Sequence, residues 1–186
     1  GARADDHVVE DHAHSLPPAA AIATPREDFP CAGAFRLYAL ECRHMGASAE
    51  LICHDASSAG AVRGFRVDVR RLAGGALEFR YRVSGDIARL RLPISHDPER
   101  RDGLWQHSCF EAFLRAAGAS AYHEFNFVPS GAWAAYRFAA RRCDRTEPAL
   151  PAPHILAHPH GDGFLLEASL DCSALAELAG AEIEAG

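Results

Sequence analysis

Two neighbouring segments of the chain alternate strictly between apolar and charged residues, and this pattern constrains the fold more than any other feature. Phe65, Val67 and Val69 alternate with charged residues in residues 65–70, and apolar and polar residues alternate in the same way through 77–83. A period of two is the side-chain period of a β-strand with one buried face. Gly74-Gly75 lies between the two segments, and glycine readily adopts the positive φ of hairpin connections. The pattern predicts an antiparallel hairpin.

Further short segments with strand character follow, separated by turn residues. Pro129-Ser130-Gly131 is such a turn signal, and it lies between two aromatic-rich segments. A short helix is predicted from Asp171 or Ser173 through Leu178, where either residue can cap it. No segment shows the alternation of strands and helices that a parallel sheet requires. We therefore predict an all-β fold, an antiparallel, jelly-roll-like β-sandwich. The additional predicted strands are 88–92, 104–114, 122–128, 133–138, 155–157, 164–170 and one that begins at 182–184.

The chain of 186 residues suits one domain. Its first part is rich in Asp, His, Ala and Pro and has almost no hydrophobic period, so it has little apolar surface to bury. We predict a low-order N-terminal arm over residues 1–44 and a β-sandwich domain over 45–186.

Composition excludes several classes of function. All 19 basic residues are arginine, so a P-loop lysine or a lysine Schiff base is excluded. The net charge of −6, without a basic stripe, argues against nucleic acid as a partner. No stretch approaches the roughly 20 apolar residues of a membrane span. The six cysteines lack Cys-x-x-Cys spacing, which favours reduced thiols and a cytoplasmic location.

A candidate binding surface emerges from the predicted strands 104–114, 122–128 and 133–138. Alternate residues of a strand share a face, so pairing these strands would gather carboxylates, an amide and flat aromatic rings. Such a mixture suits a sugar, whose ring stacks on indole while its hydroxyl groups bond to polar side chains. The alternative interpretation is a solvated outer face of an antiparallel sheet. The candidate ligand-binding residues are Trp105, His107, Glu111, Tyr122, Glu124, Asn126, Trp133 and Arg137.

The same region resembles the DOMON-like proteins, bacterial relatives of family 9 carbohydrate-binding modules. The resemblance rests on Trp-x-x-x-Cys-Phe-Glu within 103–114, on Glu-Phe-Asn and Ser-Gly-x-Trp within 122–133, on Tyr-Arg-Phe at 136–138, and on residues 77–93. It extends over about residues 48–184. It implies a β-sandwich with a ligand-binding sheet face. It also implies that family chains start near Met45 and continue beyond Gly186, so that the domain is C-terminally incomplete.

Other chemistries remain as alternatives. Haem binding, known in some DOMON domains, would need axial ligands, and Met45 is the only methionine. His154, His158 and His160, or the histidines of the first 14 residues, offer metal donors, but we predict no functional metal site. Glu111 and Glu124 would form a glycosidase-like carboxylate pair. We predict instead a non-catalytic module without a cofactor, whose partner is a small molecule, namely a carbohydrate. A protein-interaction domain is the alternative.

Overall fold

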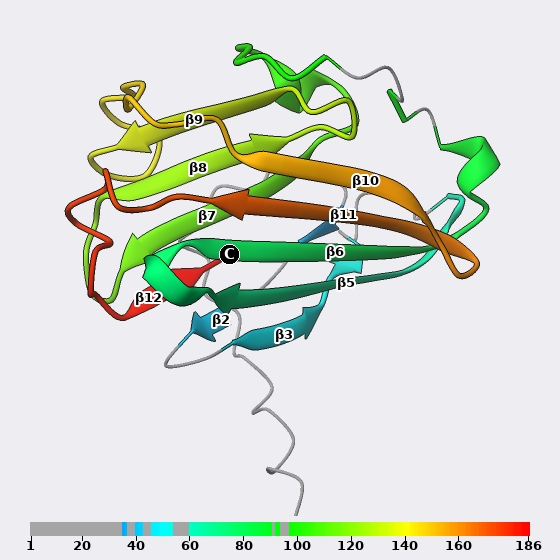
Figure 1. Ribbon diagram of the computed structural model, residues 1–186, viewed down its shortest axis with the longest axis horizontal. Coiled ribbons are helices and arrows are strands. Elements are labelled where there is room, and N and C mark those ends of the chain that lie inside the picture. Colours follow the sequence, from blue (N-terminus) through cyan, green and yellow to red (C-terminus); the bar gives the residue numbers. More distant parts are fainter. Residues whose placement is uncertain (1–34, 37–39, 43–45, 54–59, 91, 94–96) are drawn as a thin grey trace, which may run out of the picture.

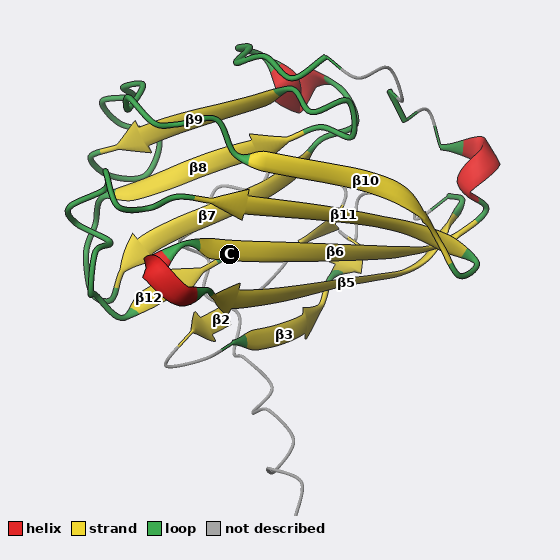
Figure 2. Ribbon diagram, in the orientation of Figure 1, coloured by secondary structure: helices red, strands yellow, loops and turns green. Residues whose placement is uncertain are grey.

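The computed structural model describes residues 35–36, 40–42, 46–53, 60–90, 92–93 and 97–186. Two five-stranded antiparallel sheets pack face to face, which confirms the predicted all-β sandwich (Figure 1). The helical segments of the described residues are three short 3-10 turns, η1 (Ala73–Gly75), η2 (Ile87–Arg89) and η3 (Leu104–Gln106) (Figure 2). None of the helices in this part of the chain has the length and apolar character needed to cross a bilayer.

We call the sheet nearer the viewer in Figure 1 the front sheet and the other the back sheet. The front sheet has the order β10-β11-β6-β5-β3, and the back sheet has the order β2-β12-β7-β8-β9. A separate pair joins β1 (Phe35–Arg36) to β4 (Ile52–Cys53). The front strands are β3 (Ala47–Glu50), β5 (Val62–Arg71), β6 (Leu77–Gly85), β10 (His154–His160) and β11 (Gly163–Leu170). The back strands are β2 (Leu40–Cys42), β7 (Phe110–Ala116), β8 (Tyr122–Phe127), β9 (Trp133–Phe138) and β12 (Ile183–Ala185).

The main core lies between the two sheets and consists of apolar side chains that alternate with polar ones along the strands. The predicted hairpin is β5–β6, in which Val67 and Tyr81 are opposite each other and both are buried. Aromatic rings from both sheets meet in this core, as where Phe79 lies 5.9 Å from Phe127. Other large side chains of the core include Val69, Leu77, Val83, Phe110, Leu114, Phe125, Trp133, Phe164 and Leu166.

The sandwich includes residues that lie before the predicted domain boundary. β2 pairs with β12 in the back sheet, and β1 pairs with β4. Both β1 and β2 fall within the segment 1–44 that was predicted to be an arm. The apolar pattern of so short a strand is too brief to detect in sequence. The rest of the predicted arm, residues 1–34, lies outside the described residues.

Three local predictions are wrong. Residues 104–106 form η3 rather than the start of a long strand, because Gly103 enters a left-handed conformation (φ 78°) and turns the chain. Residues 87–89 form η2 rather than a strand. Between 171 and 178 the chain makes turns rather than a helix, with Leu175 and Leu178 buried in the core. Their burial favours the tight turn in which the Leu178 N–H donates to the Leu175 carbonyl.

Candidate functional site

A pocket of about 250 Å³ opens on the outer face of the back sheet, the face turned away from the core. Aromatic side chains form its walls, two glutamates contribute carboxyl groups, and two arginines come from the loop after β9. The lining residues are Trp105, Glu111, Phe113, Tyr122, Glu124, Tyr136, Phe138, Arg142 and Arg145.

Strand register brings the two glutamates onto this face. Glu111 of β7 is opposite Asn126 of β8, while Glu124 of β8 is opposite Phe113. The two glutamates are therefore diagonal neighbours on adjacent strands, a relation in which Cα atoms are roughly 7–8 Å apart. On the other side of β8, Glu124 is opposite Tyr136 of β9. An aromatic ring thus flanks Glu124 on each neighbouring strand.

The two carboxyl groups have different electrostatic environments. Burial, together with the negative charge of Glu124, raises the pKa of Glu111 to about 7. Burial also raises the pKa of Glu124, but a hydrogen bond from Asn126 and the charges of Arg145 and Arg142 oppose that rise. Glu111 is therefore the carboxyl group that is more readily protonated near neutral pH.

A short hydrogen-bond chain fixes the amide of Asn126, which is fully buried. Its Nδ2 donates to Glu124 Oε1 at 3.1 Å, and its Oδ1 accepts from the thiol of Cys109 at 3.0 Å. Burial, followed by the charges of Glu111 and Glu124, raises the pKa of the Cys109 thiol, so the sulfur stays protonated. Cys109 is therefore a donor that orients Asn126, and Asn126 in turn orients Glu124.

Two aromatic pairs hold the pocket walls. The rings of Tyr122 and Phe138 stack with centroids 4.8 Å apart and an interplanar angle of 9°. The rings of Trp105 and Tyr136 meet edge to face at 5.8 Å. Tyr136 is buried, and its hydroxyl donates to Asp102 at the rim, which lowers the pKa of that carboxyl group. These contacts define the ring positions before any ligand arrives.

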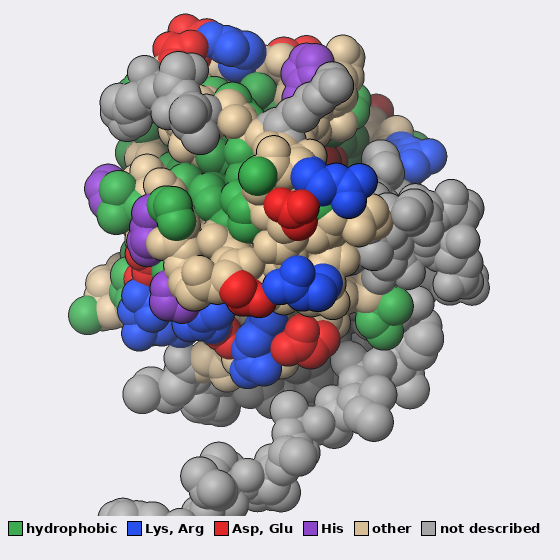
Figure 3. Space-filling model, turned by 90° about the vertical axis from the view of Figure 1, so that its right-hand side faces the viewer, with side chains coloured by type: hydrophobic (Ala, Val, Ile, Leu, Met, Phe, Trp, Pro, Cys, Tyr) green, Lys and Arg blue, Asp and Glu red, His purple; other side chains and the backbone are tan. Residues whose placement is uncertain are grey.

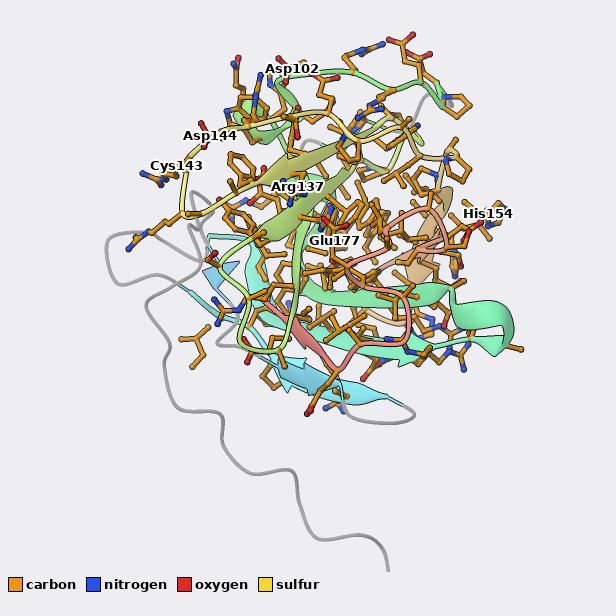
Figure 4. All side chains as sticks on the ribbon, turned by 90° about the vertical axis from the view of Figure 1, so that its left-hand side faces the viewer. Asp102, Arg137, Cys143, Asp144, His154 and Glu177 are labelled. Carbon is orange, nitrogen blue, oxygen red and sulfur yellow. The ribbon has the colours of Figure 1, made fainter. Side chains whose placement is uncertain are left out.

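The loop that follows β9 supplies the basic part of the rim. Arg142 has φ 56°, and its backbone N–H donates to the Tyr122 hydroxyl at 3.3 Å. The Arg145 guanidinium lies over the Tyr136 ring at 4.8 Å and forms an ion pair with Asp102 at 3.5 Å. In Figure 4 Asp102, Cys143 and Asp144 lie in one corner of the molecule, where this loop passes.

The structure brings together five of the eight residues predicted for the surface. Trp105, Glu111, Tyr122 and Glu124 line the pocket, and Asn126 supports Glu124. His107 is exposed just after η3, outside the pocket lining.

The predicted placement of Trp133 and Arg137 on this face is wrong. Trp133 is opposite Phe127 and belongs to the core between the sheets, with only 5% of its surface exposed. Arg137 is opposite His123 on the same inner side of β9. Its Nε donates to Glu177 Oε1 at 2.7 Å, and Figure 4 shows these two residues together, apart from the corner that holds Asp102.

The physical reason is the length of the β8–β9 connection. Val128 N–H donates to Ala132 O, so the turn contains the three residues 129–131, and Gly131 has φ 93°. This closure places Ala134, Tyr136 and Phe138 on the pocket face in place of Trp133 and Arg137. The sequence signal was therefore available in the Pro-Ser-Gly turn. No periodic pattern marks Arg142 and Arg145, which lie in a loop.

The alternatives of metal and haem binding depend on histidines, cysteines and Met45. The described part of the chain contains no group of three or more His, Cys, Asp or Glu side chains arranged to hold a metal ion. His154, His158 and His160 all lie exposed on β10. Cys109, Cys143 and Cys172 are free thiols. Met45 and the histidines at positions 7, 12 and 14 lie outside the described residues.

Comparison with known proteins gives no match: no family model, curated protein or solved structure is significantly similar to this chain.

Proposed function

We propose that this protein binds a small carbohydrate in the pocket of the back sheet, without chemical conversion. The observation that carries the proposal is the combination, in one pocket, of aromatic walls with the Glu111 and Glu124 carboxyl groups. Pockets for drug-sized ligands hold roughly 300–1,000 Å³. At about 250 Å³ this one suits a single sugar ring better than a longer oligosaccharide.

Each feature of the pocket has a role in this proposal. Trp105 is 38% exposed at the pocket mouth, where its indole can stack on the apolar face of a pyranose. Glu124, oriented by Asn126, accepts hydrogen bonds from sugar hydroxyl groups. The resemblance of about residues 48–184 to DOMON-like proteins supports the same proposal, because it implies a β-sandwich with a ligand-binding sheet face.

Calorimetric titration of the full chain with a panel of common hexoses tests this proposal. We expect binding of at least one hexose and a loss of tenfold or more in affinity in the Trp105→Ala variant. Leu156→Ala is the matched control, because Leu156 is a similarly exposed apolar residue on β10 of the front sheet. Absence of binding across the panel, or equal affinity in the Trp105→Ala variant, would contradict the proposal.

Hydrolysis of a glycoside is a second candidate, favoured by the unequal environments of Glu111 and Glu124. Glycosidases use one carboxylic acid that stays protonated beside one that stays ionised. A pocket surrounds the pair, and Arg137, whose positive charge would favour ionisation of both groups, lies on the other side of the sheet. Release of nitrophenol from aryl glycosides, abolished in a Glu111→Gln variant, would favour this candidate over simple binding.

A further inference from the structure

Of the two carboxyl groups of the pocket, that of Glu111 has the fewer compensating partners. No other described residue forms a hydrogen bond or ion pair with its side chain, and the Tyr81 hydroxyl bonds only to its backbone carbonyl, at 3.1 Å. Glu124, in contrast, has Asn126 as a donor and feels both rim arginines. When it is ionised, a half-buried carboxylate beside a second carboxylate is stabilised by a donor or a positive charge that offsets its desolvation. The pocket therefore favours a ligand that places a hydrogen-bond donor or a positive charge next to Glu111.

A protonated amine meets this need better than a hydroxyl group does. A hydroxyl group offers one donor without charge, whereas an ammonium group offers three donors and a full positive charge. Aromatic faces also attract a cation, with a strength that grows when water is excluded. The rings of Phe113, Tyr122 and Tyr136 line the same pocket as the two carboxyl groups. Carboxylates and ring faces together thus favour a cationic group in this space.

We propose that the preferred ligand of this pocket is an amino sugar, bound with its protonated amine against Glu111 and its ring against Trp105. This inference rests on the proposed carbohydrate binding and adds the chemical class of the sugar.

The positive charges of the two rim arginines are compatible with a cation bound next to Glu111. Arg145 is already engaged by Asp102 and stacks on Tyr136, so its charge is partly offset at the pocket mouth. Arg142 is exposed, where solvent screens its charge. The two arginines lower the pKa of Glu124, whereas the pKa of Glu111 is shifted by burial and by the charge of Glu124. An anionic sugar, in contrast, would bring its charge towards two carboxyl groups.

A matched series of ligands tests the inference. Glucosamine and galactosamine are compared with glucose and galactose, and with the two N-acetylated hexosamines, by titration of the full chain at pH 7 and low salt. We expect at least one hexosamine to bind tenfold or more tightly than both its parent sugar and its N-acetyl derivative. Ethanolamine serves as an amine without a sugar ring.

The outcomes separate this inference from the proposed function. Equal affinity for a hexosamine and its parent sugar would overturn the amine preference and leave carbohydrate binding intact. Binding of ethanolamine as tight as that of a hexosamine would support the amine site and contradict carbohydrate recognition. If neither the sugars nor ethanolamine bind, both ideas are overturned.

Variants and proton linkage give two further readouts. Glu111→Gln keeps the shape of the side chain and should abolish the hexosamine preference, so that the hexosamine and its parent sugar bind with equal affinity. Glu50→Gln on β3 removes the same charge from the exposed face of the front sheet and should change neither affinity. A preference unchanged in Glu111→Gln would contradict the placement of the amine.

Binding of the amine should also release protons at pH 7. Glu111 faces Glu124 and Cys109 from the sheet, Tyr122 and Tyr136 from the walls, and Arg142 and Arg145 from the rim. A cation next to Glu111 stabilises the ionised carboxylate, so the protonated fraction of Glu111 decreases and protons are released on binding. Calorimetry in two buffers of different ionisation enthalpy, neither containing a primary amine, measures this release. Absence of proton release with the hexosamine would contradict the contact.

Discussion

The outer faces of the two sheets are built from the same alternating pattern and yet have opposite character. On the front sheet, arginines and acids alternate across neighbouring strands, as in the pair Arg66–Glu50 at 3.3 Å and the contacts of Arg80 with Glu78 and Glu167. Figure 3, which views the end of the molecule, shows acidic and basic side chains interleaved over its lower part. On the back sheet, the acids Glu111 and Glu124 lie among aromatic rings.

The difference comes from the residue opposite each acid. Glu78 is opposite Arg70 and Glu167 is opposite Arg80, so each acid of the front sheet has a cation across the strand. Glu111 is opposite Asn126, and Glu124 is opposite aromatic residues on both sides. A paired acid contributes to a solvated charged surface. An acid flanked by rings lines a pocket in which a bound ligand can offset its charge.

The first prediction tests which face of β9 belongs to the core. Trp133→Ala should lower the free energy of unfolding by about 4 kcal/mol, because it empties a large volume between the sheets. Trp105→Ala should cost less than about 1 kcal/mol, since this ring lies at the exposed mouth of the pocket. Urea denaturation of both variants measures the difference. Equal losses would contradict the placement of Trp133 in the core between the sheets.

The second prediction compares one ion pair from each sheet. Arg115 and Glu184 form a pair at 2.6 Å with side chains only 13% and 10% exposed, whereas Arg66 and Glu50 are 46% and 63% exposed. Glu184→Gln removes the carboxylate that pairs with a buried guanidinium and should cost about 3 kcal/mol. Glu50→Gln should cost less than about 0.5 kcal/mol. Denaturation at low and at high salt distinguishes them, since only the exposed pair is screened.

The third prediction uses the opposite pKa shifts of two acids. The pKa of Glu111 is raised to about 7, mainly by burial, so its protonated form favours folding and its contribution to stability falls as pH rises from about 4.5 to about 7. Glu111→Gln should therefore gain about 2 kcal/mol of unfolding free energy at pH 8 and little at pH 4.

Glu78 on the front sheet provides the contrast. The hydrogen bond from Arg70 lowers its pKa, so its contribution is present at neutral pH and disappears as pH falls through the lowered pKa. Because the Arg70 side chain of this pair is 48% exposed and can be solvated by water on its own, Glu78→Gln should cost less than about 1 kcal/mol at pH 7. Stability curves measured between pH 3 and pH 8 test both variants, and slopes of the same sign would refute the comparison.

The sequence was sufficient to predict the front hairpin and most of the back sheet. Strict alternation specifies both the strand and its buried side, as Val67 and Tyr81 show. It also placed Glu111, Tyr122 and Glu124 on one face correctly. These predictions succeed because side-chain period and burial are local properties of a strand.

The failures have a different origin. The orientation of β9 depends on the length of one turn, and an error of one residue in register exchanges the two faces, as for Trp133 and Tyr136. Trp105 reaches the pocket from a 3-10 turn rather than from a strand. Arg142 and Arg145 reach it from a loop whose path is determined by tertiary contacts with Tyr122 and Asp102. Periodicity contains no information about such loops.

The position of β12 between β2 and β7 has a consequence for the order of folding. Ile183 pairs with both Cys42 and Ala116, residues far from it and from each other in sequence. β7, β8 and β9, in contrast, follow one another through short turns. Loop-closure entropy favours the local hairpins first, so we expect the pocket half of the sheet to form before β12 joins it. Until then β7 has an unpaired edge, and a partly folded chain is most prone to aggregation through that edge.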